Sequence, residues 1–134
     1  MIVVDANVMV IALTSTAADG DAARAAILAD DVWTAPAHMP LELLRTLRKA
    51  VIGHRLNPDD ADAAFRALTS MQIVYVGMDV SLMESVWAMR HNASPYDAAY
   101  LAVAAMHDAP LVTFDARLAA AAEQTKPGIR VMLL

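Results

Sequence analysis

The chain alternates between short apolar runs and longer segments whose apolar residues recur at helical spacing. The short β-branched runs predict strands at residues 1–4, 32–35, 73–76, 111–114 and 129–133. The segments between them predict helices that start near residues 6, 21, 40, 58, 80, 94 and 116. Strands that alternate with helices predict an α/β fold, in which helices cover both faces of a central parallel β-sheet.

The same pattern predicts several boundaries and core positions. We expect residues 14–20 to form a polar, mobile loop, with Asp19 or Asp21 capping a helix that ends at Leu28. Pro127 and Gly128 are expected to turn the chain before the last strand. The apolar spacing places a set of large side chains in the core: Trp33, Phe65, Leu68, Val80, Met83, Val86, Trp87 and Phe114.

Length and composition predict one domain over residues 1–134, because no repeat, linker or low-complexity stretch divides the chain. The sequence has no cysteine, which excludes disulfides, thiolate metal sites and cysteine nucleophiles and is compatible with a cytoplasmic location. No run reaches the roughly 18 apolar residues that a membrane helix needs. The start of the chain lacks the features of a signal peptide.

Net charge and hydrophobic content narrow the function classes. The net charge of −5 argues against a polybasic nucleic-acid binder. It leaves open an enzyme that acts on nucleic acid, since a bound metal ion reverses the local field. Hydrophobic residues make up 58% of the chain, which is high. The excess either lies at a subunit interface or reflects the many alanines, which helices accommodate without a partner.

The segment that begins at Ser94 predicts a buried central helix. Ser94 suits the N-cap, Pro95 suits the first helical position, and Asp97 takes the acidic place of a capping box. The residues from Asp97 to Met106 are apolar nearly all round, as in helices buried in the middle of a domain. Asp97 is therefore either a plain helix cap or a carboxylate presented at the positive end of a buried helix.

Four acidic residues are expected along one edge of the sheet. Asp5 and Asp115 follow two strands at their carboxyl ends, while Glu42 and Asp97 lie in the first turns of two helices. Helices that follow strands begin at that same edge, where ligands bind in open parallel sheets. Taken singly, each acid also has an ordinary structural explanation as a turn or first-turn residue.

A cluster of carboxylates needs a compensating charge. Two carboxylates about 4 Å apart repel by roughly 4 kcal/mol at an effective dielectric constant near 20, and a divalent cation offsets this most simply. Oxygen donors without cysteine or paired histidine favour Mg²⁺ or Mn²⁺, an arrangement suited to phosphate chemistry. Two supporting residues are expected: Asn7, to bind a ligand or water, and Thr113, to orient the site.

Basic residues follow Glu42 on its predicted helix. A solvated helix face is the simpler interpretation of Arg45, Arg48 and Lys49. The alternative is that they guide a phosphate backbone toward the acids. The four histidines show no metal-ligand spacing, and the chain has no P-loop, dinucleotide-binding or HExxH motif.

The ordered set of motifs resembles the PIN-domain family, and most closely its VapC-type toxin ribonucleases. The match covers essentially the whole chain and rests on four segments: Ile2-Val3-Val4-Asp5-Ala6-Asn7-Val8, Pro40-Leu41-Glu42, Tyr96-Asp97-Ala98-Ala99-Tyr100-Leu101-Ala102 and Leu111-Val112-Thr113-Phe114-Asp115. The chain departs from the family at Arg45, where many relatives carry a small polar residue such as Asn.

The resemblance implies a metal-dependent endoribonuclease, the toxin of a type II toxin–antitoxin pair. It implies a Mg²⁺ or Mn²⁺ site at Asp5, Glu42, Asp97 and Asp115 that hydrolyses RNA. It also implies a homodimer and a cognate antitoxin whose tail covers the acidic groove, often with an arginine. Two alternatives stay open: a catalytically silent PIN-like module that binds RNA or protein, and a haloacid-dehalogenase-like phosphatase, which needs a second Asp where Asn7 stands.

Overall fold

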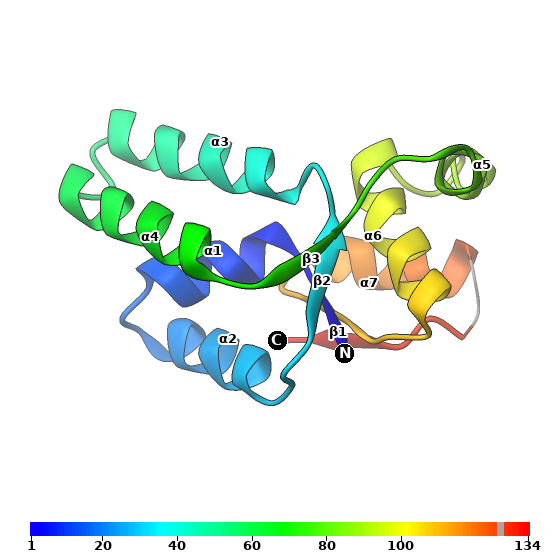
Figure 1. Cartoon of the computed structure of the whole chain (residues 1–134), viewed down its shortest axis with the longest axis horizontal. Coiled ribbons are helices and arrows are strands. Elements are labelled where there is room, and N and C mark those ends of the chain that lie inside the picture. The colour runs from blue at the N-terminus through cyan, green and yellow to red at the C-terminus, as the bar shows by residue number, and fades with distance from the viewer. Residues whose placement is uncertain (126–127) are drawn as a thin grey trace.

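A five-stranded parallel sheet runs through the molecule between two layers of helices (Figure 1). The computed structural model describes residues 1–125 and 128–134. The strands lie in the order β3-β2-β1-β4-β5, and each neighbouring pair is parallel. They comprise β1 (Ile2–Val4), β2 (Trp33–Pro36), β3 (Ile73–Val76), β4 (Leu111–Thr113) and β5 (Val131–Leu133). The predicted α/β fold is confirmed.

Within the described residues, seven helices connect and cover the strands. Helices α1 to α4 pack against one another on one side of the sheet, and α6 and α7 pack on the other, with α5 against α6 (Figure 1). None of the helices in the described residues is long and apolar enough to cross a membrane. Their bounds are α1 (Ala6–Thr14), α2 (Ala18–Leu28), α3 (Met39–Ile52), α4 (Pro58–Ser70), α5 (Val80–Ala88), α6 (Pro95–His107) and α7 (Ala116–Thr125).

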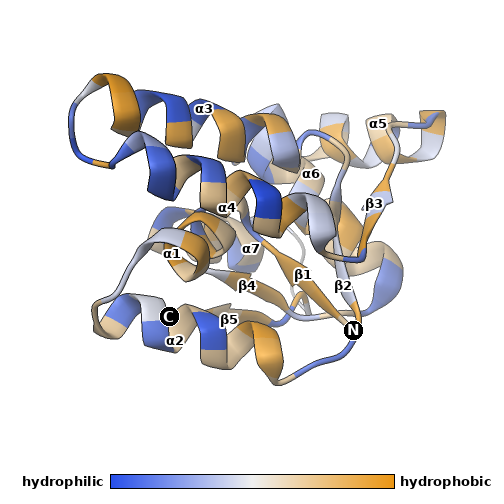
Figure 2. Cartoon of the chain, turned by 60° about the vertical axis from the view of Figure 1, so that its left-hand side comes forward, coloured by the Kyte–Doolittle hydropathy of each residue, from blue (hydrophilic) through white to orange (hydrophobic). Residues whose placement is uncertain are grey.

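The middle of the sheet and α6 form the centre of the core. Strands β1 and β4 are buried along their whole length, as parallel strands covered on both faces must be (Figure 2). Helix α6 is buried from Ala98 to Ala104, and the Ser94 hydroxyl caps it by accepting a hydrogen bond from the Asp97 N–H at 3.2 Å. The predicted central helix and its N-cap are confirmed.

The strand order fixes where a ligand can bind. The chain leaves β1 toward β2 and β3 on one side, and returns to β4 and β5 on the other. The strand order therefore reverses between β1 and β4, and the crevice beyond the carboxyl ends of these two strands is the usual ligand site of such sheets.

The start of α2 differs from the prediction. Helix α2 begins at Ala18 after an Ala17 N-cap that makes no side-chain hydrogen bond, so neither Asp19 nor Asp21 caps it. The Asp19 carboxylate instead accepts a 2.6 Å hydrogen bond from the Ser15 hydroxyl. A Cβ at Gly20 would lie 2.2 Å from the Ser15 carbonyl oxygen, so only glycine allows α2 to turn this closely against α1. The expected loop of residues 14–20 shrinks to residues 15–17.

Two large aromatic residues are exposed rather than in the core. Phe65 is 45% exposed and Trp87 is 68% exposed. On α5 the inward position belongs to Leu82, while Val80 and Met83 share the exposed face with Trp87. Helix α5 packs chiefly on α6, which leaves its other face, with Trp87, exposed.

Four other side chains that the sequence places in the core are buried or partly buried there. Trp33, Val86 and Phe114 are partly buried against the core, and Leu68 is fully buried. Gly128 adopts a φ of 114°, as expected in a turn, whereas Pro127 lies outside the described residues.

Candidate functional site

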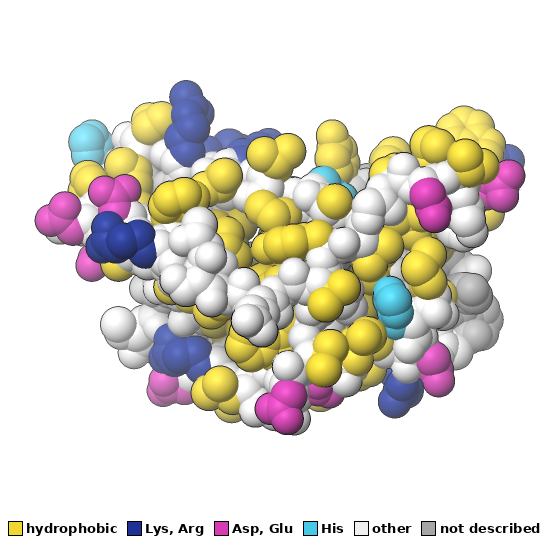
Figure 3. All heavy atoms as spheres, in the orientation of Figure 1, with side chains coloured by type: hydrophobic (Ala, Val, Ile, Leu, Met, Phe, Trp, Pro, Cys, Tyr) yellow, Lys and Arg dark blue, Asp and Glu magenta, His cyan; other side chains and the backbone are white. Residues whose placement is uncertain are grey.

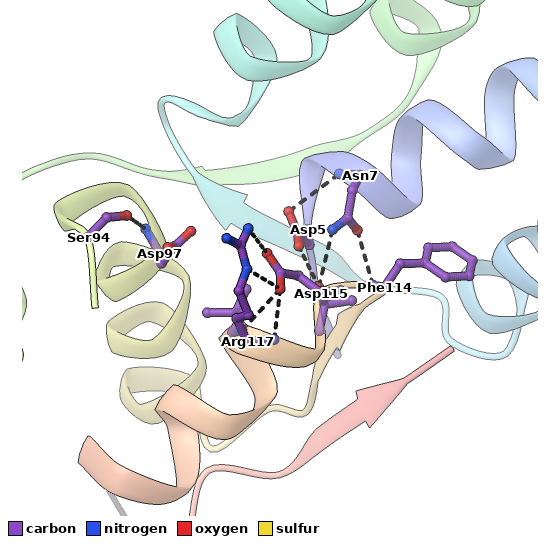
Figure 4. Close-up of polar contacts among 9 residues, drawn as sticks. Asp5, Asn7, Ser94, Asp97, Phe114, Asp115 and Arg117 are labelled. Atoms are coloured by element: carbon purple, nitrogen blue, oxygen red, sulfur yellow. Dashed lines mark hydrogen bonds and ion pairs between the residues drawn. The ribbon is translucent and has the colours of Figure 1, made fainter. Parts of the chain in front are cut away.

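Asp5 is the most buried acid of the site. It follows β1 and forms the N-cap of α1, where its Oδ1 accepts a 3.4 Å hydrogen bond from the Asn7 N–H. Its Oδ2 accepts a 2.6 Å hydrogen bond from the Thr113 hydroxyl at the end of β4 (Figure 4). Only 7% of the residue is exposed. The carboxylate therefore lies in the crevice where the strand order reverses.

Thr113 and Asn7 brace this crevice. The Thr113 hydroxyl donates to Asp5 and accepts a 2.9 Å hydrogen bond from the Asp115 N–H, so it orients both acids. The Asn7 amide donates to the Thr113 oxygen at 3.4 Å, and its own oxygen accepts the Phe114 N–H at 3.2 Å (Figure 4). Asn7 thus ties the start of α1 to the end of β4, instead of offering a free oxygen to a ligand.

Glu42 and Asp97 lie in the first turns of α3 and α6, as predicted. The Glu42 Oε2 accepts a 2.7 Å hydrogen bond from the Tyr100 hydroxyl. Burial raises the pKa of Asp5 from its ordinary 3.8 to about 6, against hydrogen bonds from Thr113 and Asn7 that lower it. The negative charges of Glu42 and Asp97 raise the pKa of Asp5 further, so both carboxylates lie close enough to repel the charge of Asp5.

Asp115 is held differently from the other three acids. It precedes α7, and its Oδ1 accepts a 2.8 Å hydrogen bond from the Arg117 N–H. The Arg117 guanidinium lies 3.4 Å from its Oδ2 (Figure 4). Partial burial acts to raise the pKa of Asp115, but the contacts with Arg117 outweigh it and the pKa is lowered. Asp115 therefore carries a charge that the chain itself compensates.

The donor set fits a hard divalent cation. All four predicted residues offer carboxylate oxygens, and three of them share an uncompensated negative field around the buried Asp5. Within residues 1–125 and 128–134, no three histidine, aspartate or glutamate side chains lie close enough together to coordinate one ion as they stand. Three direct carboxylate ligands would therefore require a side-chain movement, and among the three acids around Asp5, Asp97 is the one that neither Thr113 nor Tyr100 holds.

Three residues of the site were missing from the sequence interpretation: His38, Tyr100 and Arg117. His38 precedes α3, with its Nε2 3.6 Å from the Glu42 Oε2, and its ring packs edge-on against Tyr100. Burial lowers the pKa of His38. The four-residue spacing of His38 and Glu42, and the three-residue spacing of Asp97 and Tyr100, place each pair on one helix face and could have pointed to both residues.

Cavities border the acids on both sides of Glu42. One, of about 320 Å³, lies between α1 and α3 and includes Asp5 and Arg45. Another, of about 410 Å³, is lined by His38, Leu41, Glu42, Arg45 and Tyr96. Arg45 borders both, while Arg48 and Lys49 are exposed farther along α3, where basic side chains gather (Figure 3). A third cavity, of about 620 Å³, is mostly apolar and lies between α5 and α6, beside the acids rather than among them.

Comparison with known proteins agrees with this geometry. Residues 2–124 match the PIN domain family. Ribonuclease VapC1 of Mycobacterium tuberculosis is 37% identical over 119 residues, which cover 89% of each chain. Ribonuclease VapC9 of the same organism is 33% identical over 118 residues, or 88% of each chain.

Solved structures share the fold. The crystal structure of M. tuberculosis VapC20, titled a Sarcin-Ricin loop cleaving toxin, superposes with a TM-score of 0.67 at 23% identity and covers 90% of this chain and 95% of that one. PAE2754 from Pyrobaculum aerophilum superposes with a TM-score of 0.64 at 22% identity, over 96% of this chain and 88% of that one. Sequence and structure together show that the chain belongs to the PIN-domain family.

Proposed function

We propose that the protein is a divalent-metal-dependent endoribonuclease and the toxin of a type II toxin–antitoxin pair. The observation that carries the proposal is the buried Asp5, held at the strand-order reversal and surrounded by the charges of Glu42 and Asp97. The similarity to VapC ribonucleases supports RNA as the substrate. Membership of the PIN-domain family removes the haloacid-dehalogenase-like alternative, leaving a silent binding module as the competitor.

Each acid has a role in this proposal. Asp5, Asp97 and Glu42 would hold a Mg²⁺ or Mn²⁺ ion, and Asp115 would assist directly or through water. Such an ion supplies an acidified water and stabilises charge at the scissile phosphate. The Thr113 hydroxyl holds both the Asp5 carboxylate and the Asp115 backbone in place through hydrogen bonds. Arg45, at the edge of both cavities beside Glu42, is placed to bind a substrate phosphate.

Replacing Asp97 tests the nuclease assignment. We expect Asp97→Asn to lower metal-dependent RNA cleavage at least about 100-fold, since even changes behind the metal ligands of an enzyme cost 10- to 100-fold. The measurement is cleavage of structured and unstructured RNA with Mg²⁺, with Mn²⁺ and with chelator.

Asp60→Asn is the matched control for this variant. Asp60 and Asp97 both lie two residues after a proline in the first turn of a helix, so both substitutions remove the same favourable charge from a helix N-terminus. Asp60→Asn should cleave like the wild type. Full activity of Asp97→Asn would contradict the assignment, and metal-independent RNA binding without any products would favour the silent binding module.

The raised pKa of Asp5 predicts an unusual pH dependence of stability. Between about pH 4 and pH 6 the folded protein holds the Asp5 proton more tightly than the unfolded chain does. When a chelator removes metal ions, the contribution of Asp5 to the free energy of unfolding therefore falls as the pH rises. The free energy of unfolding that Asp5 loses across this range is on the order of 3 kcal/mol. Melting temperatures across this range should therefore fall less steeply with pH in Asp5→Asn than in the wild type. Identical slopes would contradict the burial argument.

Arg45 is expected to contribute to RNA affinity. Arg45→Ala should weaken RNA binding and reduce the salt dependence of log Kd by about one unit, because one phosphate contact is lost. Arg66→Ala on α4 removes an equal charge from an exposed position that borders neither cavity beside Glu42, and serves as the control. Binding titrations of catalytically impaired Asp97→Asn at several salt concentrations measure both effects. If the two arginine variants lose equal RNA affinity, Arg45 contributes only as a general surface charge.

We also propose that the protein acts in the cytoplasm as a homodimer with a cognate antitoxin. The exposed apolar residues Val80, Met83 and Trp87 on α5 offer the surface for a second copy (Figure 3). Trp87→Ser should convert the dimer to a monomer in light scattering without lowering the content of helix. If the dimer persists unchanged in Trp87→Ser, the interface lies on another surface.

A further inference from the structure

The Tyr100 hydroxyl joins the three segments that carry the candidate metal ligands. Tyr100 lies on α6 one turn after Asp97, and it is 1% exposed. Its O–H donates a 2.7 Å hydrogen bond to the Glu42 Oε2 on α3. The same oxygen accepts a 3.3 Å hydrogen bond from the N–H of Ala6, the residue that follows Asp5. One buried hydroxyl therefore links the elements of all three acids.

The hydrogen bond between Tyr100 and Glu42 has a defined donor and a defined acceptor. A hydroxyl has one proton to donate, and here that proton goes to Glu42. A second polar group near the same Glu42 oxygen, the His38 Nε2, lies farther away, at 3.6 Å. Tyr100 is thus the short contact that fixes the direction of the Glu42 carboxylate.

Glu42 needs such a restraint more than Asp5 does. Asp5 is short, buried and bracketed by Thr113 and the Asn7 backbone. Glu42 is longer and half-buried, and cavities open on both sides of it. Without a partner its carboxylate is free to swing away from Asp5, which its charge repels. A hydrogen bond from a rigid aromatic side chain on the buried α6 opposes that movement.

We propose that Tyr100 is a positioning residue: its hydroxyl holds the Glu42 carboxylate toward Asp5 and thereby sets the affinity of the acidic site for Mn²⁺ or Mg²⁺. The inference rests on the proposed function, because it takes Glu42 as a metal ligand. It adds that a residue which does not touch the ion determines how strongly the ion is held. Loss of such supporting hydrogen bonds typically weakens metal binding about 10- to 100-fold.

The test is a calorimetric titration of the metal-free protein with Mn²⁺. We expect Tyr100→Phe, which deletes only the hydroxyl, to bind Mn²⁺ about 10- to 100-fold more weakly than the wild type. Tyr75→Phe removes a hydroxyl from an exposed residue of β3 and should leave the affinity unchanged. Val103→Ala opens a cavity beside the fully buried face of α6 without touching an acid, and controls for lost stability. An unchanged affinity in Tyr100→Phe would overturn the inference.

A double-mutant cycle shows whether Tyr100 acts through Glu42. If it does, Tyr100→Phe should have little further effect in the Glu42→Gln background, so the two losses should be far from additive. Additive losses would mean that Tyr100 acts by another route, and would overturn the inference.

The same titrations separate this inference from the proposed function. If Glu42→Gln weakens Mn²⁺ binding and Tyr100→Phe does not, the positioning role fails while the metal site stands. If the wild type binds no Mn²⁺, or Glu42→Gln binds it as well as the wild type does, the role of Glu42 fails and the inference fails with it.

Discussion

The hydrogen bond between the Thr113 hydroxyl and the Asp5 carboxylate is the contact on which the site depends. It joins the ends of β1 and β4 at 2.6 Å, in the crevice where the strand order reverses. It offsets part of the cost of burying a carboxylate, and burial still raises the pKa of Asp5 to about 6. The fold thus buries one carboxylate at a cost in free energy, and a bound cation would offset that cost.

The remaining acids are placed by helix starts rather than by strands. Glu42 and Asp97 each lie in the first turn of a helix, a position where acidic side chains interact favourably with the helix dipole. Their charges act on Asp5, while Asp115 has a basic partner of its own, the Arg117 guanidinium 3.4 Å away. The rim therefore divides into an uncompensated half around Asp5 and a compensated half at Asp115. This division favours Asp5, Glu42 and Asp97 over Asp115 as direct ligands.

Much of this arrangement was predictable because it follows from chain order. The β-branched runs and first-turn prolines locate the strands and helices, and parallel strands bring Asp5 and Asp115 to one edge. Contacts that depend on side-chain packing were not predictable. Trp87 has the residue type and spacing of a core position, yet it is exposed because it lies on the face of α5 that does not pack on α6. Tyr100 lies in the segment predicted as a buried helix, and the partners of its hydroxyl became evident only once α3 and α1 were placed beside α6.

The central claim is that the acids around Asp5 form one divalent-metal site. Anomalous diffraction from crystals grown with Mn²⁺ tests it most directly. We predict a peak at the edge of the sheet, coordinated by carboxylate oxygens of Asp5 and Glu42 and, after a side-chain movement, of Asp97, with waters completing the octahedron. The absence of a peak there, at Mn²⁺ concentrations that support RNA cleavage, or a peak bound elsewhere on the molecule, would contradict the claim.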